Sequence, residues 1–293
     1  MSHVASDSEP RSRRRPQEAR LSPQALAASR GGVREGLAWL GRPPESTASR
    51  LVHVVNALVR LTLFGVFRFR VRREGRELLP KHGGYLVVAA IHRGWMDPFL
   101  ILSALPLEPR AWFLGSGPSA FSARWRELLL HRLGGMLPVW RGGVGVEQHV
   151  ASAQAVLENG GVFVLVPEGG VAGPPDHLAT FRLGAALIAI RTDAPLVPVA
   201  LAGADELYLG KRMASRILPP TSARALLGPN WDGAAPAAGS RAEMTLAQAL
   251  TRRFEEVLGP AVAALYPGTV DPPTHPRRLR RLTWLLLARP TAR

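Results

Sequence analysis

Tyr85-Leu-Val-Val-Ala-Ala-Ile-His-Arg-Gly-Trp-Met-Asp-Pro-Phe99 is the stretch on which the fold of this 293-residue chain depends. Its first residues, as far as Ala90, form an apolar run with the length and composition of a buried strand. After a polar turn, a second apolar run from Phe99 to Leu105 predicts a short helix. The turn therefore joins a strand to a helix, which is where open α/β sheets place their ligand crevices.

The turn carries one histidine and one aspartate, His92 and Asp97. An imidazole can remove a proton from an alcohol near neutral pH, and a carboxylate bonded to its Nδ1–H fixes the tautomer and stabilises the imidazolium. Because no Ser or Cys nucleophile stands beside the histidine, we expect the activated hydroxyl to belong to a substrate. A structural alternative is an ordinary helix start, with Asp97 as N-cap, Pro98 at the first helical position and His92 in a loop. A carboxylate has lone pairs for both roles.

Strand and helix patterns alternate through the middle of the chain. Alternation of this kind is typical of an α/β fold, here a single domain with a mostly buried central sheet flanked by helices. We expect Thr245 and Gln248 to form the capping box of the last helix. The predicted strands are 67–71, 85–90, 111–114, 136–139, 162–166 and 196–201, and the predicted helices are 99–105, 125–133, 147–158, 183–190 and 245–265.

Residues 51–67 are the most apolar stretch, and His53, Asn56 and Arg60 recur there at helical spacing as one narrow polar stripe. A helix of ~17 residues is ~25 Å long, which is short for crossing a bilayer. We therefore expect an apolar membrane-associating helix that lies in the interface or re-enters it, with its polar stripe toward the protein. A buried core helix is the alternative.

Three regions follow from these patterns. Residues 1–45 are expected to be a disordered or weakly helical basic extension, and the lack of an apolar h-region argues against a secretory signal. Residues 46–270 form the expected α/β domain, which includes the apolar helix. Residues 271–293 form a basic amphipathic tail, in which arginines from Arg277 onward precede Trp284 and its leucines. That composition is typical of an interfacial membrane anchor.

The chain has a net charge of +15 and no cysteine. The lack of cysteine excludes a disulfide framework, a thiolate nucleophile and a Cys-based metal site. The positive charge implies an anionic partner, either nucleic acid or a membrane surface. Several arginines crowd the apolar C-terminus, whereas a nucleic-acid groove would interleave them with aromatics. We therefore expect an anionic membrane surface and no nucleic acid.

Four motifs in order, across roughly residues 67–230, resemble those of the glycerolipid acyltransferases of the lysophosphatidic acid acyltransferase type. The third motif of that family usually reads Phe-Pro-Glu-Gly-Thr-Arg, and here Gly170-Val171 replaces its Thr-Arg. One phosphate-binding arginine of the family pattern is thereby missing. The matching segments are His92-Arg-Gly-Trp-Met-Asp-Pro98, Gly135-Met-Leu-Pro-Val-Trp-Arg141, Val166-Pro-Glu-Gly169 and Leu196-Val-Pro-Val199, with Phe181-Arg-Leu-Gly-Ala185 after the third.

The resemblance implies a membrane-associated O-acyltransferase that moves a fatty acyl group from acyl-CoA or acyl-carrier protein to a lysophospholipid hydroxyl. The most direct reaction converts lysophosphatidic acid to phosphatidic acid, with His92 and Asp97 as the general-base pair. The alternatives are another lipid acceptor and a non-catalytic lipid-binding relative. The residues expected to contact substrate are Arg93, Arg141, Glu168, Gly169 and Arg182.

The same resemblance implies no metal and no cofactor besides the acyl donor, because a thioester already has a good leaving group. The expected location is the cytoplasmic face of the cell membrane, with peripheral or monotopic attachment.

Overall fold

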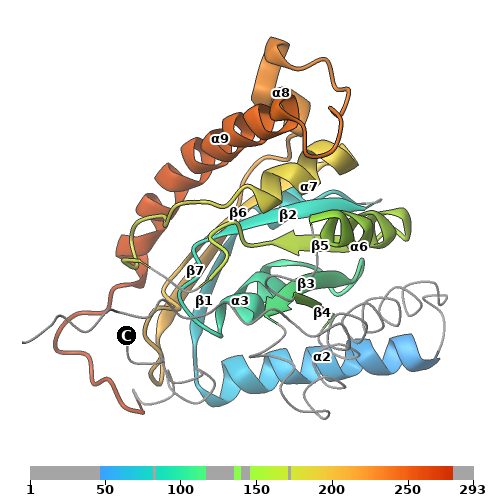
Figure 1. Cartoon of the computed structure of the whole chain (residues 1–293). Coiled ribbons are helices and arrows are strands. Elements are labelled where there is room, and N and C mark those ends of the chain that lie inside the picture. The colour runs from blue at the N-terminus through green and yellow to red at the C-terminus, as the bar shows by residue number, and fades with distance from the viewer. Residues whose placement is uncertain (1–46, 82–83, 117–134, 140–145, 171–172, 280–293) are drawn as a thin grey trace, which may run out of the picture.

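The computed structural model describes residues 47–81, 84–116, 135–139, 146–170 and 173–279 (Figure 1). Several sequence predictions lie outside these residues: the N-terminal extension as far as residue 46, the helix 125–133, Arg141, Val171, and the tail from residue 280 onward.

The described residues form one seven-stranded sheet with the order β1-β7-β6-β2-β5-β3-β4. β6 and β7 pair antiparallel and every other pair is parallel, so β1 and β7 run opposite to the remaining strands. The expected α/β class with one central sheet is confirmed. The strands are β1 (Arg70–Glu74), β2 (Tyr85–Ala90), β3 (Ala111–Ser116), β4 (Met136–Val139), β5 (Val162–Leu165), β6 (Leu196–Ala202) and β7 (Arg212–Ile217).

β2 lies at the centre of the sheet because its residues are apolar on both faces. All of them are fully buried, and a strand that is covered on both faces reads as a continuous apolar run. Leu86 and Val88 face one hydrophobic core, whereas Tyr85 and Val87 face the other. The sheet therefore separates two cores, each of which needs its own layer of helices.

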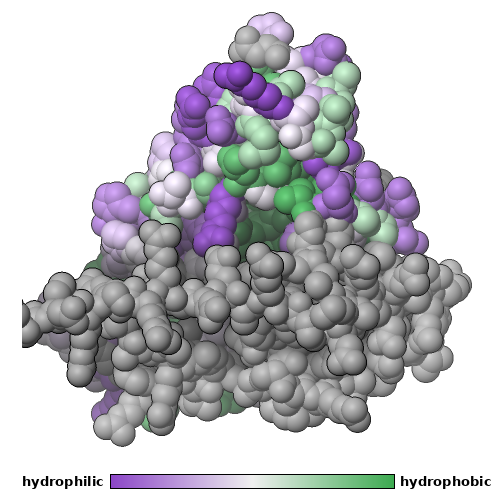
Figure 2. Space-filling view, viewed as in Figure 1, coloured by the Kyte–Doolittle hydropathy of each residue, from purple (hydrophilic) through white to green (hydrophobic). Residues whose placement is uncertain are grey.

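The helices supply those two layers (Figure 1). α2 (Thr47–Val66) and α3 (Asp97–Ala104) pack on the side of Tyr85 and Val87. The helices α6 (Val146–Glu158), α7 (Gly184–Thr192), α8 (Ala223–Leu227) and α9 (Arg241–Leu265) pack on the other side. Hydrophilic residues gather over the outer parts of α9 and α6, and hydrophobic residues lie in the hollow between them (Figure 2). Short 3₁₀ turns are η1 (Arg76–Leu78), η3 (Gly228–Asn230) and η4 (Tyr266–Thr269).

The predicted capping box of α9 is wrong, because the helix begins one turn earlier. Ser240 is the N-cap and accepts the Glu243 N–H at 3.1 Å, while Glu243 Oε2 accepts the Gly239 N–H at 2.7 Å. Thr245 lies inside the helix and donates its hydroxyl to the Arg241 carbonyl. The Ser-x-x-Glu signature of a helix start was therefore present at residues 240–243.

Two details of the sheet also differ from the prediction. The strand expected at residues 67–71 begins only at Arg70, because Arg68 has a φ of 51° and interrupts the extended backbone. β7 was not predicted; it inserts between β1 and β6, with Met213, Ala214 and Ser215 buried.

α2 starts four residues earlier than the predicted helix and ends one residue before it, and it exposes apolar side chains: Val54 is 55%, Leu58 55% and Leu61 71% exposed. Arg60, from the predicted polar stripe, turns inward and donates to the Leu105 carbonyl. In the part of the chain that is described, no helix is both long and apolar enough to cross a bilayer. The membrane role of α2 stays a prediction.

Candidate active site

The catalytic turn predicted from the sequence lies at the carboxyl end of β2, and α3 begins at Asp97. β5 is the parallel neighbour of β2, so the carboxyl ends of the two strands meet at the same edge of the sheet. The turn after β2 carries His92, and the turn after β5 carries Glu168. The topology thus brings together two motifs that lie far apart in the sequence, at an edge where α/β sheets bind ligands.

His92 and Asp97 are in direct contact. Nδ1 of His92 lies 2.9 Å from Oδ2 of Asp97, and the side chains are 22% and 2% exposed. The imidazole therefore holds a buried carboxylate with one nitrogen while part of the ring reaches the surface. This is the arrangement in which a carboxylate fixes the tautomer and leaves Nε2 to accept a proton.

The Asp97 side chain bonds to the backbone of the turn that precedes it and does not cap α3. Its Oδ2 atom also accepts the backbone N–H groups of Arg93 at 2.6 Å and Gly94 at 2.7 Å. Met96 holds the N-cap position, and no side-chain cap hydrogen bond is formed there. The helix-cap alternative for Asp97 is therefore wrong, although a proline does occupy the first turn as expected.

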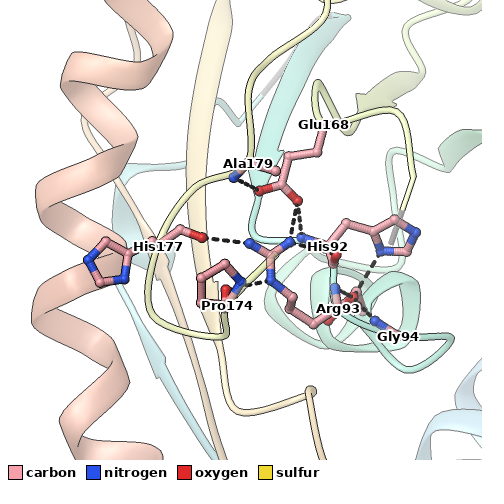
Figure 3. Close-up of polar contacts among 8 residues, drawn as sticks. His92, Arg93, Gly94, Glu168, Pro174, His177 and Ala179 are labelled. Carbon is pink, nitrogen blue, oxygen red and sulfur yellow. Dashed lines mark hydrogen bonds and ion pairs between the residues drawn. The ribbon is translucent and has the colours of Figure 1, made fainter. Parts of the chain in front are cut away.

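Behind the histidine, Arg93 and Glu168 form a buried ion pair (Figure 3). Nη1 of Arg93 lies 2.9 Å from Oε2 of Glu168, and the side chains are 4% and 0% exposed. The same Oε2 accepts the backbone N–H of His92 at 2.6 Å, and Oε1 accepts the Ala179 N–H at 3.0 Å. Glu168 thus holds the backbone of His92 directly.

The remaining contacts of Arg93 are with backbone carbonyls. Its guanidinium donates to the carbonyls of His92 at 2.9 Å, Pro174 at 2.8 Å and His177 at 2.6 Å. Figure 3 shows the guanidinium lying between the turn of His92 and the loop that carries Pro174 and His177. Because these acceptors and Glu168 surround a buried side chain, the geometry favours a positioning role for Arg93. Substrate contacts of Arg93 and Glu168 stay predictions.

Arg182 lies across Gly169. Gly169 has a φ of +66°, and a Cβ placed on it would come within 2.5 Å of Cδ of Arg182. The backbone N–H of Arg182 donates to the Pro167 carbonyl at 2.8 Å. This bond fixes the backbone position from which the exposed Arg182 side chain extends. The structure therefore places one predicted cation beside the third motif, whereas Arg141 lies outside the described residues.

Asp205 is a residue near the site that the sequence analysis missed. Burial raises the pKa of its carboxyl, and the negative charges of Glu206 and Asp97 raise it further, while Lys211 opposes them. Within the described residues its buried Oδ1 atom has no hydrogen-bond partner. Only the position of Asp205 just beyond the fourth motif could have signalled it.

The loop that carries Asp205 also packs against the turn after β2. A Cβ on Gly94 would lie 3.1 Å from the carbonyl oxygen of Ala204, which is a tight contact. This close approach accounts for a glycine at position 94.

Among the described residues, no group of three or more His, Cys, Asp or Glu side chains could hold a metal ion.

Comparison with known proteins gives one family. Residues 70–202 match the family model described as Acyltransferase, and this span runs from β1 to β6 and includes the whole turn that carries His92 and Asp97. Residues 70–202 therefore form an acyltransferase domain. The resemblance to acyltransferases is thereby confirmed, and the protein is an acyltransferase enzyme. A search of curated proteins gave no match.

A solved acyltransferase has a similar fold. The crystal structure of the 1-acyl-sn-glycerophosphate (LPA) acyltransferase PlsC from Thermotoga maritima superposes with a TM-score of 0.54 at 20% sequence identity. The match covers 82% of this acyltransferase and 90% of that chain. At this identity the likeness establishes the fold alone.

Proposed function

We propose that this acyltransferase transfers a fatty acyl group from acyl-CoA or acyl-carrier protein to the free hydroxyl of lysophosphatidic acid, which yields phosphatidic acid. The observation that carries the proposal is the 2.9 Å contact between His92 Nδ1 and the buried Asp97 carboxylate. The LPA acyltransferase of similar fold supports this substrate class.

The proposed reaction proceeds without an acyl-enzyme. Nε2 of His92 takes the proton from the acceptor hydroxyl, and the oxygen attacks the thioester carbonyl carbon. The tetrahedral intermediate collapses, the C–S bond breaks, and the thiolate leaves and takes the proton from the imidazolium. Asp97 stabilises the imidazolium in between, because its buried negative charge lies against Nδ1.

Phosphate recognition is assigned to Arg141, with help from Arg182. A phosphate monoester carries close to two negative charges near neutral pH, and arginine can pair with it through two donors. Arg182 is exposed next to Gly169, which in sequence precedes by two positions the residue that matches the family's second arginine. Arg93 is a weaker candidate, because its guanidinium is already bonded to Glu168 and to backbone carbonyls.

The enzyme is proposed to act at the cytoplasmic face of the cell membrane, attached peripherally or monotopically. The exposed positions of α2 recur at the spacing of one helix face, Val54, Leu58 and Leu61. Apolar side chains on the outer face of a helix, with an arginine turned inward, are typical of an interfacial helix. The basic tail would add attraction to an anionic leaflet.

Product analysis by mass spectrometry tests the proposal. Purified protein is offered one acyl-CoA, or the same chain on acyl-carrier protein, with lysophosphatidic acid, glycerol 3-phosphate, another lysophospholipid and monoacylglycerol as separate acceptors. We expect phosphatidic acid to form fastest. Faster acylation of monoacylglycerol would mean that the acceptor is an uncharged lipid. The absence of product with every acceptor would support a non-catalytic lipid-binding protein.

A further inference from the structure

Three arginines gather at the C-terminal end of α3, away from the catalytic turn. Nη1 of Arg60 in α2 donates to the Leu105 carbonyl at 3.4 Å, and Nε of Arg73 in β1 donates to Oγ of Ser103 at 3.2 Å. Arg76 in η1 follows shortly after β1, and its positive charge and that of Arg73 both act on Arg60. We call these three residues the α3-end cluster.

Capping of the C-terminus of α3 does not account for the three positive charges of the α3-end cluster. A helix C-terminus carries roughly half a negative charge, which is less than one guanidinium neutralises. Two acids are next to the cluster in sequence. Glu74 is already bonded to Arg72 at 2.8 Å and Arg216 at 2.6 Å, and Glu77, which follows Arg76, forms no ion pair with the three arginines among the described residues. Since successive strand residues point to opposite faces, Glu74 and Arg73 lie on opposite sides of β1.

The cluster is therefore short of negative charge. In the part of the chain that the structure describes, no carboxylate pairs with Arg60, Arg73 or Arg76. The buried Nε atom of Arg60 also has no hydrogen-bond partner among these residues. Burial, followed by the charges of Arg76 and Arg73, lowers the pKa of Arg60 to about 10. A bound anion would relieve both the repulsion and the loss of solvation.

The neighbouring surface indicates which anion. Leu61 follows Arg60 directly in α2, and it belongs with Val54 and Leu58 to the exposed apolar face of that helix. A phosphate oxygen suits paired guanidinium donors, and a lipid presents its phosphate beside apolar chains. We propose that the α3-end cluster binds the phosphate group of a phospholipid at the bilayer surface, while the exposed face of α2 enters the apolar layer.

This lipid site is separate from the acceptor site. The catalytic turn lies at the N-terminal end of α3, and a helix of eight residues is ~12 Å long. The phosphate bound at the α3-end cluster is thus not that of the reacting acceptor. The proposal rests on the membrane attachment given under the proposed function but on none of its chemistry.

Vesicle binding of the full chain tests the site. Arg73→Gln/Arg76→Gln is the test variant, because both side chains are exposed and the fold should tolerate their loss. Arg241→Gln/Arg252→Gln removes the same charge from exposed positions of α9, on the opposite side of the sheet. Vesicles of phosphatidylcholine carry either phosphatidylglycerol or, at equal surface charge, oleate. Circular dichroism and urea unfolding confirm that each variant is folded.

We expect the test variant to lose about 30-fold in affinity for phosphatidylglycerol vesicles, from ~1 kcal/mol per arginine. The α9 control should lose less than about threefold, because charges beyond a Debye length are screened. Equal losses in both variants, or an equal loss on oleate vesicles, would overturn the phosphate site. Release of the wild type by inorganic phosphate, at an ionic strength matched with chloride, would assign the cluster to free phosphate. Acyl transfer by the wild type in detergent reports on the proposed function independently.

Discussion

One carboxylate oxygen of Asp97 holds His92 and also closes the turn in which His92 lies. Oδ2 is 2.9 Å from the imidazole Nδ1 and accepts the backbone N–H groups of Arg93 and Gly94. The same negative charge therefore orients the imidazole and fixes the backbone that carries it. The proposed catalysis and the local fold therefore depend on the same atom, and variants must be chosen to separate the two effects.

Asp97→Asn should lower acyl transfer by roughly 10²–10⁴-fold, the range for loss of general-base catalysis. The amide is close in size to the carboxylate, but it has no negative charge and can accept on one side only, so the imidazolium is no longer stabilised. Initial rates at saturating acyl-CoA measure the effect, and urea unfolding reports any loss of fold. Full activity in a folded Asp97→Asn protein would leave the carboxylate with a structural role only.

Glu168→Gln should lower both stability and kcat, with a smaller effect on the KM for the acceptor. The substitution leaves the buried Arg93 guanidinium without its charge partner, which costs about 3–5 kcal/mol, and loosens the backbone of His92. Urea unfolding and steady-state kinetics measure the two effects.

Glu256→Gln is the matched control for that substitution. Its ion pair with Arg253 is 51% and 59% exposed, so removal should change stability by no more than about 0.5 kcal/mol. A rise in acceptor KM with unchanged kcat in Glu168→Gln would mean that Glu168 contacts the substrate and does not position the histidine.

The sequence predicted those parts of the fold in which the residues of a single strand or turn are enough to identify it. β2 and β4 match their predicted bounds, because short apolar runs ended by polar or glycine residues have few other solutions. β7 was not predicted, because Arg212, Ser215 and Arg216 interrupt its apolar pattern. Its arginines are accommodated only by tertiary partners, Asp271 for Arg212 and Glu74 for Arg216.

The site divides in the same way. His92 and Asp97 could be paired from the sequence because they lie five positions apart in one turn. The partnership of Arg93 with Glu168 spans 75 positions and depends on β2 and β5 being neighbours, which the strand order alone decides. The carbonyls of Pro174 and His177 that Arg93 binds carry no side-chain signal at all.

Arg141→Ala should weaken binding of lysophosphatidic acid by about 1.5–3 kcal/mol, and Arg141→Lys should be nearly as damaging because lysine lacks the paired donors. Arg182→Ala should give a smaller loss, since its side chain is exposed next to Gly169. The measurement is kcat/KM for lysophosphatidic acid beside that for an uncharged monoacylglycerol. If Arg141→Ala lowers both values equally, the residue does not recognise phosphate.

Stability should depend on pH through Glu243. A hydrogen bond from Arg191, at 2.9 Å between Nη2 and Oε2, holds the pKa of Glu243 below its usual value. A depressed carboxyl pKa stabilises the fold above the unfolded value near ~4.3, and the contribution is lost as pH falls through the folded value. Glu243→Gln should therefore cost about 1.5–3 kcal/mol at pH 7.

The cost of Glu243→Gln should shrink as the pH falls below about 4, because the wild-type carboxylate is then protonated as well. Urea midpoints of wild type and variant across this range measure it. A difference that does not vary with pH would show that the charge of Glu243 contributes nothing.

The rate of acyl transfer by His92→Ala tests the central claim most directly. His275→Ala, at a histidine whose ring packs against Tyr208, serves as the control. With acyl-CoA and lysophosphatidic acid in detergent, we predict a fall of roughly 10²–10⁴-fold in His92→Ala, with circular dichroism and the urea midpoint close to wild type. The control should keep wild-type activity. A folded His92→Ala protein with activity within a few-fold of wild type would contradict the assignment of His92 as the base.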